Sequence, residues 1–195
     1  MAMSVAVPQG VTSLLSQDVQ VVPSAPKVLD ARVETCSDSE VQLRSLRESD
    51  RALLYDILHG TRMFTIEEVG VALELIDLGL RSRECGYRFV VAEIDRRVGG
   101  YACFGRAPCT DAVFELYWIA VDRQLHGRGV GRQLLDTVEA SVCAEGGRML
   151  LIETDSKPEY ESTRRFYQRR GCRVVARIPD FYKPGDDKIV YAKRF

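Results

Sequence analysis

The sequence predicts an α/β domain (α+β in the looser sense) in which helices cover both faces of one mixed sheet. Three observations predict it: stretches with strand periodicity, stretches with helical periodicity, and their order, β-α-α-β-β-β-α-β-α-β-β. A chain of 195 residues suits one domain, which we expect at 38–195. Residues 1–37, rich in Val, Ser, Pro and Gln, are expected to form a flexible N-terminal tail, with a further strand through "VQVVP" as the alternative.

The first half of the domain is predicted as strand, helix, helix and hairpin. "VQLRSLRESD" alternates apolar and polar residues from Val41, and "ESD" supplies capping residues for a helix from about Arg51. A second helix begins at Thr65, with Glu67 and Glu68 in its first turn. "YRFVVAEID" and "VGGYACFG" flank the turn "DRRVGG" and form a hairpin.

The second half begins with "AVFELYWIAV", a strand rich in aromatic and β-branched residues. A glycine-rich loop then opens a helix that ends at Gly146 and Gly147. "RMLLIETD" is a buried strand and "YESTRRFYQRRG" a helix closed by Gly171. "CRVVARI" and "KIVYAKRF" are the last two strands, joined by "PDFYKPGDD". The apolar face of the third helix is Val130, Leu134, Leu135, Val138 and Val142.

Charge and hydropathy argue against two classes of partner. The net charge is -1, so the basic excess that favours nucleic acid or an anionic membrane is missing. No apolar run is long enough to span a membrane, and the first residues lack the features of a secretory signal. We therefore expect a small ligand.

The cysteines are scattered and form no Cys-x-x-Cys pair. Several lie in apolar runs such as "YACFG", where a reduced thiol packs as a small hydrophobic group. With only two histidines the chain offers poor material for zinc, and we expect no metal. Reduced thiols favour a cytoplasmic location. The six are Cys36, Cys85, Cys103, Cys109, Cys143 and Cys172.

The strand, glycine-rich turn and helix at "YWIAVDRQLHGRGVGRQLL" form a typical phosphate-binding arrangement, because free amides at a helix start favour an anion. The P-loop pattern fails, since no lysine and hydroxyl residue follow Gly131. The dinucleotide pattern fails too, since Arg132 stands where its last glycine would be. A strand-to-helix turn without a ligand is the alternative for the hexapeptide taken alone.

The hexapeptide from His126 to Gly131 resembles the pyrophosphate loop of the GNAT N-acetyltransferases, [QR]-x-x-G-x-[GA], in every position except the first. The resemblance extends over the stretch from Val41 to Phe195. "ELYWIAV" is similar to the fourth strand of that family, and "TRRFYQRRGCRVV" to its fourth helix and sixth strand. One departure is Tyr160, which stands where family members often have asparagine.

The resemblance implies a mostly antiparallel seven-stranded sheet with four helices, splayed between its fourth and fifth strands. It implies acetyl-CoA as co-substrate, its pantetheine arm along the fourth strand and its phosphates on the loop amides. Arg128 and Arg132 could pair with the pyrophosphate or with the 3'-phosphate, or simply lie exposed at the helix start. The residues implied in acetyl-CoA binding are Ile119, Ala120, Val121, His126, Gly127, Arg128, Gly129, Val130, Gly131 and Arg132.

Two residues are candidates for proton transfer. Glu115 stands 14 residues before Gly129, the spacing at which related acetyltransferases carry a catalytic glutamate. It is expected to act as general base, with a solvent-facing or substrate-binding role as the alternative. Tyr167 matches the general acid of many family members, with a purely packed tyrosine as the alternative, and its neighbour Phe166 is expected in the core. A backbone N–H of the splayed strand would bind the oxyanion.

The acceptor site is less defined. Tyr117 and Trp118 are expected on opposite faces of their strand, so that one of them contacts the acceptor. The segment "DFYKPGDDK" would overhang the site, with Tyr182 lining it and acidic residues attracting a cationic amine. A polar hairpin with its turn at Pro184-Gly185 is the alternative. The acidic residues are Asp180, Asp186 and Asp187.

These observations predict a cytoplasmic N-acetyltransferase that moves acetyl from acetyl-CoA to a primary amine of a small molecule or peptide. No serine or cysteine lies in an obvious constellation with either histidine, so direct attack in a ternary complex is favoured over a covalent acyl-enzyme. The alternative function is a non-catalytic acyl-CoA-binding sensor or interaction domain. The sequence leaves open whether the protein forms a homodimer.

Overall fold

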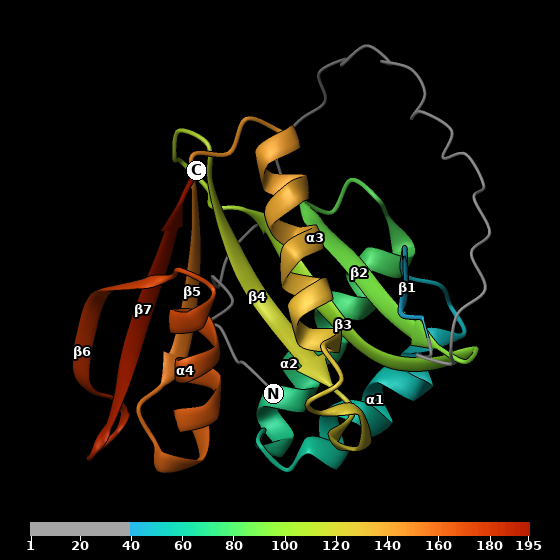
Figure 1. The fold of residues 1–195 in the computed structure, drawn as a ribbon, viewed down its shortest axis with the longest axis horizontal. Helices are drawn as coiled ribbons and strands as arrows, with labels where there is room; N and C mark the ends of the chain where they lie inside the picture. The colour runs from blue at the N-terminus through green and yellow to red at the C-terminus, as the bar shows by residue number, and fades with distance from the viewer. Residues whose placement is uncertain (1–39) are drawn as a thin grey trace.

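The structure, a computed structural model, describes residues 40–195. These residues form a seven-stranded sheet in the order β1-β2-β3-β4-β5-β7-β6, with four α-helices (Figure 1). The elements are β1 (Gln42–Arg44), α1 (Asp50–Thr61), α2 (Ile66–Arg81), β2 (Tyr87–Ile94), β3 (Arg97–Arg106), β4 (Val113–Val121), the 3-10 helix η1 (Arg123–Leu125), α3 (Val130–Ala144), β5 (Met149–Asp155), the 3-10 helix η2 (Pro158–Tyr160), α4 (Glu161–Arg169), β6 (Arg173–Lys183) and β7 (Asp186–Arg194).

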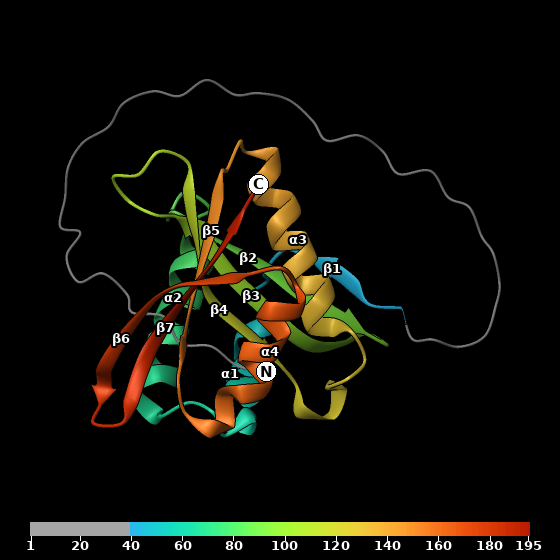
Figure 2. The ribbon, with the colours of Figure 1, turned by 60° about the vertical axis from the view of Figure 1, so that its left-hand side comes forward.

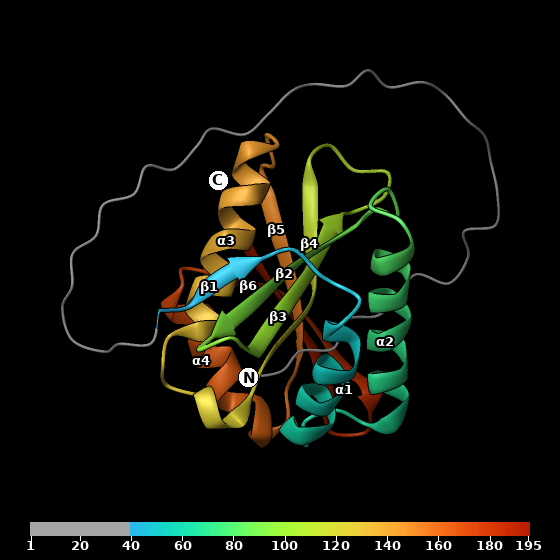
Figure 3. The same ribbon diagram turned by 90° about the vertical axis from the view of Figure 1, so that its right-hand side faces the viewer.

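The layers follow the predicted class. All neighbouring strands pair antiparallel except β4 and β5, which are parallel. Helices α1 and α2 lie on one face of the sheet and α3 and α4 on the other (Figure 3). The core lies between these helices and β2 to β5. Strands β6 and β7 form the outer edge beyond β5 (Figure 2). The predicted order of strands and helices, and the mixed sheet covered on both faces, are confirmed.

The first residues of α2 and α1 can be compared with the capping residues predicted for them. Thr65 and Glu68 form a reciprocal capping box: the Glu68 amide donates to Thr65 Oγ1 at 3.2 Å and the Thr65 amide to Glu68 Oε2 at 2.7 Å. At α1 the Ser49 side chain makes no capping hydrogen bond. The Asp50 carboxylate accepts from the amide of Arg47, which precedes the helix, at 2.8 Å, so the side-chain cap predicted from "ESD" is not observed at this helix start.

The turn between β2 and β3 is shorter than predicted. It consists of Asp95 and Arg96, both at positive φ (50° and 63°), which fits a two-residue hairpin. Gly99 and Gly100 of "DRRVGG" lie within β3. A Cβ atom at Gly100 would lie 2.6 Å from the Ala120 carbonyl oxygen, so this glycine permits the close approach of β4.

The predicted tail, and the strand through "VQVVP" that was its alternative, lie outside the described residues. Within residues 40–195, every helix is too short or too polar to cross a membrane.

Candidate active site

Strands β4 and β5 separate along their length and leave an open edge of backbone between them (Figure 1). They pair only from Val113 with Met149 to Leu116 with Ile152. Beyond this point β4 continues to Val121, paired with β3, while β5 continues paired with β7. The predicted splay is confirmed.

A β-bulge in β4 lies at the point where the two strands part. Phe104 of β3 pairs with Leu116 and Cys103 with Trp118, so Tyr117 is an extra residue without a cross-strand partner. A bulge bends the strand and redirects side chains, and bulges are over-represented next to active sites.

The bulge places the side chains of Tyr117 and Trp118 on the same face. Trp118 pairs with Cys103, and Tyr87 pairs with Gly105 two residues along β3, so Trp118 and Tyr87 share a face. The Tyr117 ring contacts the Tyr87 ring edge-on at a centroid distance of 5.1 Å. The prediction that Tyr117 and Trp118 point to opposite faces is therefore wrong, because the bulge interrupts the alternation.

Glu115 is half-buried on this same face, since it too pairs with Gly105. Burial raises the pKa of its carboxyl, the Tyr117 hydroxyl that hydrogen-bonds it lowers the pKa, and Glu153 raises it further. Lys188 acts weakly in the lowering direction. The result is a carboxylate with a raised pKa directly before the splay.

The loop before α3 presents free amides. Gly127 and Gly129 adopt positive φ (80° and 82°), a conformation that glycine takes without steric cost. The first hydrogen bond of α3 runs from the Gln133 amide to the Gly129 carbonyl at 3.0 Å. The amides of Val130 and Gly131 therefore have no acceptor within the helix and are available to an anion.

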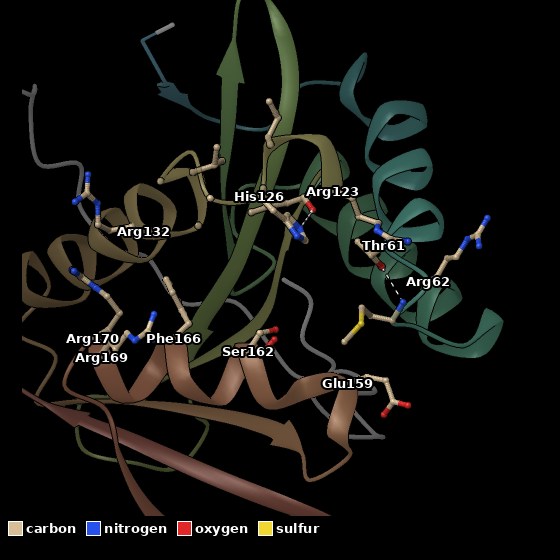
Figure 4. A pocket seen from close by; sticks show the side chains of 18 residues that line it. Thr61, Arg62, Arg123, His126, Arg132, Glu159, Ser162, Phe166, Arg169 and Arg170 are labelled. Carbon is tan, nitrogen blue, oxygen red and sulfur yellow. Dashed lines mark hydrogen bonds between the residues drawn. The ribbon is translucent and has the colours of Figure 1, made fainter. Parts of the chain in front are cut away.

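A cavity of about 720 Å³ lies between this loop and α4 (Figure 4). Five arginines and one glutamate are the charged residues that line it, so the cavity favours an anion. Arg132, Arg169 and Arg170 gather at one end, and Arg62 and Arg123 at the other (Figure 4). The lining residues are Thr61, Arg62, Met63, Val121, Arg123, Leu125, His126, Gly127, Gly129, Val130, Gly131, Arg132, Glu159, Ser162, Thr163, Phe166, Arg169 and Arg170.

Most of the residues predicted to bind acetyl-CoA line this cavity together. Val121, His126 and the residues from Gly127 to Arg132 do so, except Arg128. Ile119 and Ala120 are fully buried in β4 and do not line it. A phosphate-bearing ligand fits this lining, because loop amides and arginine side chains converge on one hollow.

The contribution of α4 and of the end of α1 was not predicted. Arg169 and Arg170 lie in "RRFYQRRG", which the sequence shows as a basic stretch without indicating which side of the helix faces the loop. Arg62 follows α1 at positive φ (53°), a conformation that no sequence pattern marked.

Tyr167 is buried, as in the packed alternative, and Phe166 is less buried than predicted. Tyr167 is fully buried, its ring lies 5.9 Å from that of Tyr191, and burial raises its pKa well above the ordinary value. It does not line the cavity. Phe166, predicted in the core, is only partly buried: one side packs on the core and the side chain lines the cavity.

The segment "PDFYKPGDD" is mostly strand. Strand β6 runs through Tyr182 to Lys183, which pairs with Asp186 at the start of β7, and Gly185 in the turn adopts positive φ (80°). The hairpin with its turn at Pro184-Gly185 is thus the observed geometry. Asp187 accepts from Arg177 at 2.5 Å.

Tyr160, at the position where the family often has asparagine, is buried and donates its hydroxyl hydrogen bond to the Met63 carbonyl at 3.0 Å. It ties η2 to the segment between α1 and α2. Among residues 40–195, no group of three or more His, Cys, Asp or Glu side chains is placed to hold a metal ion.

Comparisons with known proteins agree with this geometry. The profile of the acetyltransferase (GNAT) domain matches residues 85–173. A GNAT-family protein from Desulfovibrio desulfuricans is 41% identical, with a TM-score of 0.77 over 80% of this chain and 99% of that one.

A more distant structure shares the fold. A Salmonella typhimurium protein, whose structure contains acetyl-CoA as its cofactor, is 20% identical with a TM-score of 0.64 over 80% of this chain and 94% of that one.

A curated relative is an uncharacterized N-acetyltransferase of Methanocaldococcus jannaschii, 32% identical over 106 residues. The match covers 54% of this chain and 65% of that protein. Together, the Desulfovibrio structure, the domain profile and the splayed sheet lead to one assignment: this chain belongs to the GNAT family of N-acetyltransferases.

Proposed function

We propose that the protein transfers acetyl from acetyl-CoA to a primary amine by direct attack in a ternary complex. The observation that carries the proposal is the arginine-lined cavity at the α3 start, which meets the splay of β4 and β5 at Val121. The loop amides would hold the pyrophosphate, and the β4 backbone around Ile119 to Val121 would hold the pantetheine and the oxyanion.

The reaction needs no redox step. The lone pair of the neutral amine attacks the thioester carbonyl carbon, so that a C–N bond forms and the C–S bond breaks. The amine nitrogen loses one proton and the departing thiolate gains one, which leaves an acetamide and the free thiol of CoA. The protein must therefore supply a base and an acid.

Glu115 is the proposed base, acting through water. Its half-burial and raised pKa move it toward the pKa of the amine it must deprotonate. Tyr117 and Trp118, on the same face, would contact the acceptor. The acid limb of the pH profile should follow Glu115: activity rises as the pH passes above its raised pKa, and this limb disappears in Glu115→Gln.

Tyr167 is the proposed acid. A phenol is protonated at pH 7 and so has a proton to give to the thiolate, although burial raises the pKa of Tyr167 well above its ordinary value and makes it a weaker acid. Its neighbour Phe166 lines the cavity and contacts the Tyr167 ring edge-on at a centroid distance of 5.2 Å.

The function is tested by isothermal titration with acetyl-CoA and by thiol release with a broad amine panel. Absence of acetyl-CoA binding would reject the proposal, and binding without turnover would favour an acyl-CoA sensor instead. We expect Tyr167→Phe to lower kcat at least about a hundredfold. The matched control is Tyr191→Phe, whose ring lies 5.9 Å away. An unimpaired Tyr167→Phe would show that the acid is another group.

We also propose a cytoplasmic location. Its support is that the cysteines within residues 40–195 are all unbridged, including the exposed Cys109 and Cys143.

A further inference from the structure

Carboxylates gather on the face of the sheet that carries Glu115. Leu151 of β5 pairs with Glu115, and side chains alternate along a strand, so Glu153 and Asp155 share this face. Lys188 pairs with Asp155 and lies on it too. Five carboxylates lie here against two ammonium groups, an excess of three negative charges. They are Glu68, Glu115, Glu153, Asp155 and Asp186, with Lys157 and Lys188.

The lysines leave part of this cluster unsatisfied. Lys157 Nζ lies 2.9 Å from Asp186 Oδ2 and 3.6 Å from Asp155 Oδ2. The Asp155 and Asp186 side chains are only 4% and 1% exposed. Yet Oδ1 of each has no hydrogen-bond donor among the described residues, since the Tyr160 hydroxyl beside Asp155 donates its proton to the Met63 carbonyl. Because an unpartnered buried carboxylate oxygen is costly, both atoms indicate a donor that the protein itself does not supply.

The surroundings select a cationic donor. Burial raises the pKa of Asp155 to about 6, against the lowering effect of Lys157, and the carboxylates of Asp186 and Glu68 add to the rise. Tyr182 lies among the same carboxylates. An incoming ammonium group brings both N–H donors and positive charge, whereas a carboxylate on the acceptor would be repelled.

Strand β5 sets the distance between Glu115, where the amine would react, and Asp155. Asp155 lies four residues beyond Leu151, the partner of Glu115. At about 3.3 Å per residue this separates the two positions by roughly 13 Å along the strand.

We propose that the acceptor is an aliphatic diamine or polyamine. One amino group reaches Glu115 and is acetylated, while a second, protonated amino group binds beside Lys157 at the Oδ1 atoms of Asp155 and Asp186. The proposal rests on the proposed function and specifies the substrate class of the same site.

The test compares a homologous series of α,ω-diamines with n-alkylamines of the same length, by kcat/KM and by mass detection of the product. We expect the wild type to prefer the diamine at least about tenfold when its ends span the distance between the two positions. Asp186→Asn should reduce this preference at least about tenfold, because the second ammonium loses a charged acceptor.

Two further variants separate this effect from misfolding and from overall charge. Lys157→Gln frees both carboxylates, so the preference for diamines should increase, an outcome that a damaged fold does not produce. Glu161→Gln removes a negative charge from the exposed first turn of α4, where Glu161 pairs with Arg165, and should leave the preference unchanged. Acetyl-CoA affinity, measured by titration, checks that each variant is folded.

The outcomes distinguish the inference from the function on which it rests. Equal efficiency with diamines and alkylamines, or an unchanged preference in Asp186→Asn, overturns the inference and leaves the acetyltransferase intact. Binding of acetyl-CoA without acetylation of any diamine also overturns it. Failure to bind acetyl-CoA rejects the proposed function, and the inference with it.

Discussion

His126 Nε2 donates a hydrogen bond to the carbonyl oxygen of Val121 at 3.1 Å, which ties the glycine loop before α3 to the end of β4. Burial lowers the pKa of His126, so the ring is neutral at pH 7 and adds no positive charge to the loop. On the proposed function, the glycine amides, which do not depend on this side chain, would supply most of the contacts to phosphate.

We therefore expect His126→Gln to leave acetyl-CoA affinity within about tenfold, or 1.4 kcal/mol. Isothermal titration at pH 7 measures it. His59→Gln on α1, where His59 stacks on Tyr55, is the control because it removes the other described histidine away from the cavity. A larger loss confined to His126→Gln would mean that the imidazole itself contributes to ligand binding.

Arg169 is expected to bind the 3'-phosphate of CoA. It lies with Arg132 at one end of the cavity, and neither has a carboxylate partner within the described part of the chain (Figure 4). Arg170 beside them is already paired with Asp136. Arg169→Ala should weaken acetyl-CoA binding about tenfold, and should have little effect on acetyl-dephospho-CoA.

Titration of both ligands against both proteins gives a double-mutant cycle. Arg165→Ala is the matched control, since Arg165 lies on α4 but pairs with Glu161 and does not line the cavity. An equal loss with both ligands would assign Arg169 to the pyrophosphate or to folding.

Features set by local chemistry could be predicted from the sequence. The capping box of Thr65 and Glu68 and the turn at Gly185 each depend on residues within a few positions of one another. The glycine loop before α3 is likewise a continuous motif, and most of its residues line the cavity.

Features that depend on strand pairing and on the rotation of a helix could not be predicted from the sequence. The bulge at Tyr117 depends on how β3 is aligned with β4, and no residue in "ELYWIAV" marks it. The rotation of α4 decides that Phe166 lines the cavity and Tyr167 is buried, and it depends on packing against distant residues such as Tyr191 of β7. The pairing of Lys157 with Asp186 joins positions 29 apart in the sequence.

Replacing either of two glycines by alanine should change the free energy of unfolding, but in opposite directions. Gly129 caps α3 at φ 82°, where a Cβ atom is strained, so Gly129→Ala should lower the free energy of unfolding by about 1–2 kcal/mol. Gly70 lies exposed inside α2 with no atom near its added Cβ, so Gly70→Ala should raise it by about 0.5–1 kcal/mol. Urea denaturation measures both, and equal signs would contradict the left-handed cap.

Asp155 should make the protein less stable as the pH rises. Its pKa is raised from 3.8 to about 6 by folding, so the folded state binds more protons than the unfolded state between these values. The contribution of this group to the free energy of unfolding is therefore greatest below about pH 4 and falls until about pH 6, by at most about 3 kcal/mol.

The variant Asp155→Asn removes the titration but keeps the size of the side chain. The difference in free energy of unfolding between variant and wild type should thus move in favour of the variant from pH 4 to pH 7. A constant difference for Asp155→Asn across this range would contradict the raised pKa, and with it the picture of Asp155 as a buried carboxylate lacking a full set of partners.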